Sequence, residues 1–209
     1  MSEQQNGVIV SGVGRVPVQP DVLVAVLGAE VVAGSVQDAM DRCSAAVTAT
    51  IAALNEWGVA NADLGTSGAS VYAAHDQHGN QRGWTATQQL TAKLRDIDTA
   101  GDLVSRALAV AGDAARLHNL AFEVADDTAA RTEARRLAFA EARSKAELYA
   151  ELAGRELGAV RAVTEGVGGG HAPGREFDTS MMMAKGSMPI EAGSLEVTVG
   201  VTVQWDFVG

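Results

Sequence analysis

The amino-acid sequence predicts a soluble α+β protein that consists mainly of antiparallel sheet with three helices. Three observations lead to this class. Residues 195–207 alternate between apolar and polar side chains, extended segments at 64–75 and 84–96 flank a polar loop, and three further segments have helical spacing. The predicted order is β-β-α-β-β-α-β-α-β-β. Hairpin-linked strands with helices between other strands are typical of α+β folds rather than doubly wound parallel sheets.

The N-terminal region predicts two strands separated by a turn. Residues 8–13 form a short apolar run that contains glycine, and Pro17 and Pro20 indicate the turn that follows. Residues 22–32 are rich in β-branched side chains and are apolar at both odd and even positions. We therefore expect this second segment to be a central strand that is buried on both faces.

A helix is predicted from the serine at position 35 to the glycine at position 58. Ser35 is a suitable N-cap, with Asp38 three residues later as a weak capping box, and Gly58 suits the residue that follows the helix. The single cysteine falls in the apolar stripe of this helix. We expect it to be a small buried side chain rather than a reactive thiol. The stripe consists of Val36, Met40, Cys43, Val47, Ile51 and Leu54.

The second half of the chain predicts two more helices and three strands. A helix is expected over 98–112, a strand over 117–124, the longest helix over 126–153 and a strand over 157–165. In the last strand, 195–207, the odd-numbered residues are apolar and should face the core. The longest helix carries a small residue at every fourth position, which allows a neighbour to approach closely. These residues are Ala134, Ala138, Ala142, Ala146 and Ala150.

Composition and charge restrict the partners of this protein. The chain has 209 residues and a formal net charge of −10, with a pI near 4.8. This acidity argues against nucleic acid or an anionic membrane surface as the main partner, because phosphate groups are repelled. A chain of this length can bury a large core without a disulfide or metal, so we expect one domain over 1–209 with a flexible N-terminus at 1–6.

The sequence also bears on the compartment. No run of 18 apolar residues occurs, so a transmembrane helix is not predicted. Residues 1–7 have neither the basic start nor the apolar centre of an export signal. On this basis we expect a cytoplasmic location without membrane insertion. The single cysteine excludes an intramolecular disulfide.

Few patterns in the sequence predict chemistry. Residues 11–15 faintly resemble a nucleotide-binding loop, but no helix follows, which favours a bulged or closely packed strand. His75 and His78 flank Asp76 in the hairpin loop at 75–83. A metal site there would need a further ligand, which favours a solvated loop. We expect no catalytic residue, no cofactor and no metal, with binding of a small molecule or metal by this loop as the alternative function.

The segment 166–193 is predicted to be a long irregular loop, and it carries a glycine run and a methionine run. Loops of this length usually have a function or are disordered. Methionine is favoured at adaptable binding surfaces, but a loop that folds back on its own core would explain the run equally well. Both interpretations stay open. The subunit contact that we predict here consists of Met181, Met182, Met183 and Met188.

Several segments together resemble one known family, the SIMPL-domain family, also called domain of unknown function 541. Residues 10–14, followed by a Pro-Asp pair and an apolar strand, are similar to the family's opening. Residues 57–66 resemble its step into a strand, and 134–158 resemble its long alanine-rich helix. Residues 188–193 lead into an alternating last strand, as in the family. The resemblance covers about residues 7–208.

This resemblance implies an α+β fold, no known catalytic residues and a tendency to form closed homo-oligomers. We therefore expect a non-enzymatic protein that assembles with itself into a ring or cage, in a role that is related to stress. Its expected partner is another copy of the same chain, with no cofactor and no nucleic acid.

Overall fold

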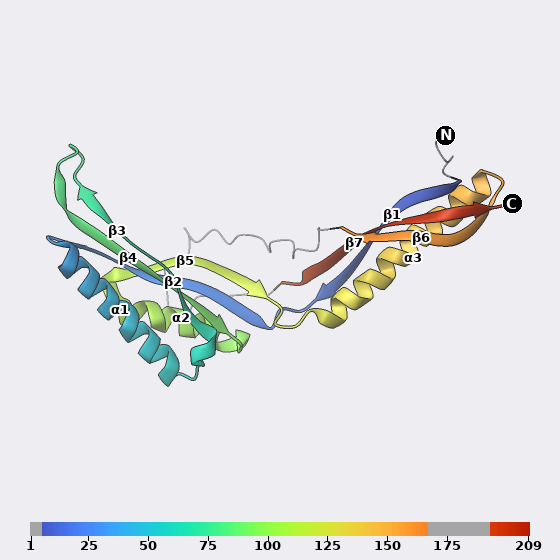
Figure 1. The fold of residues 1–209 in the computed structure, drawn as a ribbon. Helices are drawn as coiled ribbons and strands as arrows, with labels where there is room; N and C mark the ends of the chain where they lie inside the picture. Colours follow the sequence, from blue (N-terminus) through green and yellow to red (C-terminus); the bar gives the residue numbers. More distant parts are fainter. Residues whose placement is uncertain (1–5, 167–192) are drawn as a thin grey trace. The chain divides into compact units, whose positions relative to one another are not determined.

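The computed structural model describes residues 6–166 and 193–209, which form two compact units (Figure 1). Within the described residues, unit 1 comprises 6–19, 124–166 and 193–209, and unit 2 comprises Pro20–Glu123. Each unit has its own cluster of buried apolar side chains. The observed element order agrees with the predicted one, so the α+β class is confirmed. The prediction of a single domain over 1–209 stays a prediction.

Unit 2 consists of an antiparallel four-stranded sheet in the order β3-β4-β2-β5. Helices α1 and α2 lie together on one face of this sheet (Figure 1). The core is formed by this face of β2 and β4 and by the buried stripes of the two helices. The elements are β2 (Val22–Ala33), α1 (Val36–Glu56), the 3-10 turn η1 (Asn61–Asp63), β3 (Leu64–His75), β4 (Gln81–Leu94), α2 (Ile97–Ala111), η2 (Gly112–Ala114) and β5 (Ala115–Glu123).

The central strand β2 corrects one prediction. Its odd-numbered residues are buried beneath the helices, as in Leu23 and Ala25, which are fully buried. The other face is only partly covered: Val24 and Val26 are half-buried, and Val32 is 54% exposed. The expectation of burial on both faces is therefore wrong. Both helices of this unit pack on the same face, and among residues 6–166 and 193–209 only the neighbouring strands shield the other.

Unit 1 is a three-stranded antiparallel sheet in the order β1-β7-β6, with α3 on one face (Figure 1). The odd-numbered residues of β7 from Leu195 to Trp205 and the alanine stripe of α3 are buried on the facing sides of sheet and helix, which confirms both predictions, while Phe207 at the strand end is half-buried. Gly12 and Gly14 of β1 make the close approach possible, because a Cβ at either position would overlap the backbone of α3. The elements are β1 (Gly7–Val18), α3 (Thr128–Leu152), β6 (Glu156–Glu165) and β7 (Leu195–Val208).

The first strand is longer than predicted. It extends through Pro17, which lies opposite Glu196 of β7, where the sequence indicated a turn. β1 is at the edge of its sheet, so one side of the strand needs no hydrogen-bond donors from its backbone. A proline is tolerated in such a position, and the turn follows only at 19–21.

Candidate functional site

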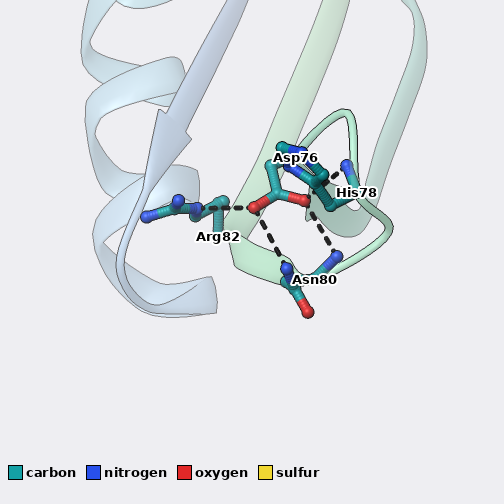
Figure 2. Close-up of polar contacts among 4 residues, drawn as sticks. All are labelled: Asp76, His78, Asn80 and Arg82. Carbon is teal, nitrogen blue, oxygen red and sulfur yellow. Dashed lines mark hydrogen bonds and ion pairs between the residues drawn. The ribbon is translucent and has the colours of Figure 1, made fainter.

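The tip of the β3–β4 hairpin is organised around the carboxylate of Asp76 (Figure 2). This carboxylate accepts hydrogen bonds from the backbone N–H of His78 at 2.9 Å and of Asn80 at 3.0 Å, and from Arg82 Nε at 3.0 Å. The Asn80 N–H contributes most to holding the pKa of Asp76 below its usual value, and the His78 N–H and Arg82 act in the same direction. Asp76 thus acts as the acceptor that fixes the turn.

This geometry leaves the hairpin-loop hypothesis without support. His75 and His78 are both exposed, and the Asp76 carboxylate between them is already engaged. Among residues 6–166 and 193–209, no group of three His, Cys, Asp or Glu side chains is placed to hold a metal ion. No observation at the loop favours a small-molecule site over a structural turn.

The outer strand of the hairpin, β3, is a more informative feature than the tip. β3 forms one edge of its sheet and has no Asp, Glu, Lys or Arg along its whole length. Between register shifts at 66–68 and 74–75, residues 68–74 pair regularly with β4. In an antiparallel strand, alternate residues direct their N–H and C=O groups away from the partner. We call residues 68–74 of β3 the open edge.

Of the four sheet edges in the described residues, the other three carry charge or irregular backbone. On β1, the Glu141 carboxylate accepts a hydrogen bond from the Val13 N–H, and Lys145 Nζ donates to the Ser11 carbonyl at 3.0 Å. Side chains of α3 therefore occupy backbone groups of β1. The Val13 N–H, and then Lys145, hold the pKa of Glu141 below its usual value, so that this carboxylate stays charged.

The remaining two edges, β6 and β5, are disrupted in other ways. β6 has register shifts on both sides of Val160, and its Arg161 pairs with Asp206 of β7. β5 has a register shift against β2, and its Arg116 pairs with Glu30 at 3.0 Å. Bulges and edge charges are the usual means by which proteins prevent strand pairing with another chain. The open edge of β3 has neither within its seven residues.

Apolar side chains lie beside the open edge. α1 packs mainly over β2 and β4, and it leaves Val71 36% exposed and Met40 45% exposed. Tyr72, on the opposite face of β3, is 50% exposed. A cavity of about 250 Å³ lies between α1 and this part of the sheet, and Cys43 contributes to its lining.

The cysteine itself is structural. Cys43 is 2% exposed, and its thiol donates to the carbonyl oxygen of Ala29 at 3.3 Å. Burial raises the pKa of this thiol, which disfavours the reactive thiolate. The prediction of a small buried side chain is confirmed.

The other predicted site residues have separate outcomes. Met181, Met182, Met183 and Met188 lie outside the described residues, so their predicted role in a subunit contact stays a prediction. Gly12 and Gly14 belong to β1 and face α3, which is the closely packed strand that was favoured over a nucleotide loop. None of the helices in the described part of the chain is both long and apolar enough to span a bilayer.

Comparison with known proteins identifies the family. The model of the SIMPL family, described as a protein of unknown function (DUF541), matches residues 8–205. The chain belongs to the SIMPL family. Two relatives are each 26% identical to it over 223 residues, covering 99% of this chain and 86% of the relative. Both are called 26 kDa periplasmic immunogenic protein, one from Brucella melitensis biotype 1 and one from Brucella abortus.

These relatives correct the expected location. Their name places them in the periplasm, which overturns the expectation that this SIMPL chain is cytoplasmic. That expectation was drawn from the composition of residues 1–7 and from the lack of a long apolar run. A few polar residues at the beginning of a sequence do not determine a compartment, whereas the two relatives with the periplasmic name align with 99% of this chain.

Sequence reasoning did not find the open edge. The uncharged composition of 64–74 was visible, but the sequence does not reveal that β2, and not β3, occupies the middle of the sheet. It also gave no indication that Glu141 and Lys145 reach the backbone of β1. The two contacts join residues 128 and 134 positions apart, and in the sequence Glu141 and Lys145 look like an ordinary helical i,i+4 pair.

Proposed function

We propose that this SIMPL chain is a non-enzymatic protein whose copies assemble through the open edge of β3 into a closed homo-oligomer, a ring or a cage. The observation that carries the proposal is the contrast among the four described sheet edges. Three are blocked by side chains, bulges or charges, and residues 68–74 of β3 are not. An uncharged, regular edge is the kind of surface to which another strand adds.

The simplest contact pairs β3 with β3 of a second copy in the antiparallel direction. Such a contact is self-complementary and places the exposed Val71 and Tyr72 side chains of both copies beside each other. A two-fold contact closes at two copies, so a ring or cage needs a second surface. We propose the outer face of β1 for it, where Ile9 is 55% exposed and Val13 is 44% exposed.

The electrostatics of the described residues favour a structural role. Asp76, Glu141 and Glu165 all have pKa values held below the usual range, by backbone N–H groups in the first two and by Arg135 in the third. A general acid or base that works near neutral pH needs a pKa shifted toward neutrality. The carboxylates with resolved shifts move in the opposite direction, and each stabilises a turn, an edge or a strand–helix contact.

The working compartment that we propose is the periplasm, and the support is the name of the two relatives. A role related to stress stays a prediction that rests on the family resemblance.

The test measures the mass of the full chain by light scattering, together with variants of β3. We expect a mass that is a multiple of 21.5 kDa. Val71→Lys and Gly68→Lys should lower it to the smaller assembly that the second contact alone can hold, because a lysine on an edge strand opposes strand addition. Both positions have room: Val71 is 36% exposed, and a Cβ at Gly68 would approach only the Gln89 side chain, at 3.7 Å. Thr48→Lys is the control, since it places a lysine at an exposed position of α1 that belongs to neither proposed contact.

Two results would reject parts of this proposal. A full-length mass near 21.5 kDa rejects assembly. An oligomer that both β3 lysine variants and the control leave intact rejects the open edge as the contact. A further variant, in which a short Gly-Ser linker replaces 172–188, tests the competing contact at the methionine run. If only the linker variant loses the oligomer, the subunit contact is in the 172–188 segment and not at the open edge.

A further inference from the structure

Unit 1 has a groove that the assembly proposal does not use. α3 packs over β1 and β7, and the glycines of β1 draw it to that side of the sheet. α3 therefore covers only part of the helix-facing side of β6, and Val163 is 54% exposed there. The resulting open groove has a volume of about 550 Å³, which lies in the range of small-molecule sites. Its lining consists of Arg135, Arg136, Phe139, Ala140, Arg143, Val163, Glu165 and Val201.

The spacing of the lining residues on α3 explains why they gather there. Arg135, Phe139 and Arg143 follow one another at steps of four, one position after the alanines that are buried against the sheet. They therefore form the stripe next to the buried one. The Phe139 ring packs against Trp205 of β7 with 5.9 Å between ring centroids, and Val201 beside it is 6% exposed. The floor of the groove is thus apolar and fixed.

The rim of the groove is cationic. Three arginines and one glutamate give the lining a formal charge of +2, and two glutamates just outside it pair with Arg136 and Arg143. Arg135 is held against both carboxylate oxygens of Glu165, at 2.9 and 3.1 Å. The contact between Arg143 and Glu147 uses Nε, at 2.8 Å. A guanidinium has five N–H donors, so Arg143 can bind a second carboxylate without losing the first.

We propose that this groove binds a small amphiphile that has a single carboxylate head and an apolar body about the size of a medium-chain fatty acid. The body packs on Phe139, Val163 and Val201, and the head pairs with Arg143. An apolar floor beneath arginines selects an anionic amphiphile over a neutral one or a bare anion. A second copy of the chain is a poorer occupant, since the adjoining β6 edge is bulged on both sides of Val160. The proposal does not rest on assembly.

The experiment titrates the full-length protein with decanoate, below its critical micelle concentration, in an isothermal calorimeter. Decan-1-ol supplies the body without the charge, and acetate supplies the head without the body. We expect saturable binding of about one decanoate per chain. Decanol should bind at least about tenfold more weakly, because it lacks the charge-assisted contact, and acetate should give no measurable heat.

Two variants locate the site. Arg143→Gln should weaken decanoate about tenfold while leaving decanol unchanged. Val163→Asp, at a half-exposed position, should abolish decanoate binding by placing a like charge on the apolar wall. Arg161→Gln is the matched control: it is an ion-paired arginine of the same unit that lies outside the groove, and it should bind normally.

Each outcome decides the proposal. Circular dichroism melting shows whether each variant is folded. If Val163→Asp does not fold, Arg143→Gln, which lies on the exposed surface of the helix, still tests the site. The absence of saturable decanoate binding overturns the proposal. Equal affinity for decanoate and decanol would show that the groove does not recognise the carboxylate head. Binding that neither groove variant alters, or that Arg161→Gln weakens as much, places the ligand elsewhere.

Discussion

The two units solve the same packing problem with different side chains. In each unit an antiparallel sheet carries a long helix on one face. In unit 1 the buried residues of α3 are all alanines, and Gly12 and Gly14 of β1 face them. In unit 2 the contact residues of α1 include Cys43, Val47 and Leu54, so larger side chains fill the space between helix and sheet.

This difference determines which edge each helix can protect. Because α3 lies close to β1, its Glu141 and Lys145 side chains reach over the strand and bond to its backbone. α1 is centred on β2 and β4 and leaves β3 largely uncovered. In unit 1 the close packing of α3 therefore also protects the β1 edge. No helix lies close to β3 in this way, so the backbone groups at its edge stay available for pairing.

The largest expected effect comes from widening the contact in unit 1. Gly14→Val should destabilise unit 1 by about 4 kcal/mol or more. The new Cβ would overlap the Ala134 carbonyl oxygen, and this atom belongs to the helix backbone and cannot move aside alone. Gly200→Val, on the open face of the same sheet, should change stability by less than about 1 kcal/mol. Chemical denaturation monitored by Trp205 fluorescence, with Trp57 and Trp84 replaced by Phe, reports on unit 1 alone. A small effect at Gly14 would contradict the backbone contact.

The second prediction tests the register of β7. Val203 is fully buried, and Val203→Asp should cost about 3 kcal/mol or more because the carboxylate would be buried without a partner. Its neighbour Thr202 is exposed and shares a hydroxyl hydrogen bond with Ser11 at 2.8 Å, so Thr202→Asp should cost about 1 kcal/mol or less. Melting temperatures of the two variants make the comparison, and equal shifts would show that the alternation does not set the faces.

Local sequence patterns predicted the elements well. The alternation in 195–207 and the alanine spacing in 134–150 both specified which residues are buried, because period-two and helical patterns report directly on one face. The element order followed from the same patterns. The end of β1 was missed because tolerance of Pro17 depends on the strand being at an edge, which is a property of the assembled sheet.

The candidate sites depend on contacts between distant segments, and the sequence did not predict them. The open edge exists because β2 pairs with both β4 and β5 and leaves β3 outermost. The groove exists because β1, at the other end of the chain from β7, draws α3 away from β6. The four-residue spacing of Arg135, Phe139 and Arg143 was visible in the sequence, but only the position of α3 on the sheet shows that this stripe borders an uncovered strand.

A smaller effect is expected at the start of α1, where unit 2 relies on capping. Ser35 is the N-cap, and its hydroxyl accepts the Asp38 N–H at 3.2 Å. Ser35→Ala should cost about 1 kcal/mol, and Ser35→Gly only a few tenths. Urea denaturation of the two variants gives both values. If glycine is as harmful as alanine, the capping role is wrong, and the first turn of α1 is held by the packing of Ala39 instead.

The smallest effect is local and depends on pH, and it compares the protected edge with the open one. The Val13 N–H, and then Lys145, lower the pKa of Glu141 in the folded protein. A lowered folded pKa means that this carboxylate stabilises β1 fully above the ordinary glutamate range and stops doing so as the pH falls through the lowered value. Hydrogen exchange at the Val13 amide should therefore lose protection on acidification, whereas the amides of residues 68–74 have no Asp, Glu, Lys or Arg side chain on their own strand and should show no matching loss.

Glu141→Gln supplies the control for that measurement. The amide keeps a carbonyl oxygen that can accept the Val13 N–H but carries no charge and does not titrate, so the protection at Val13 should be lower at neutral pH and nearly independent of acidification. The global melting temperature should change little, because Glu141 is on the surface of α3. If the variant keeps the acid sensitivity of the parent at Val13, another group protects this edge. The contrast between a β1 edge covered by side chains of α3 and an uncovered β3 edge would then need a different physical cause.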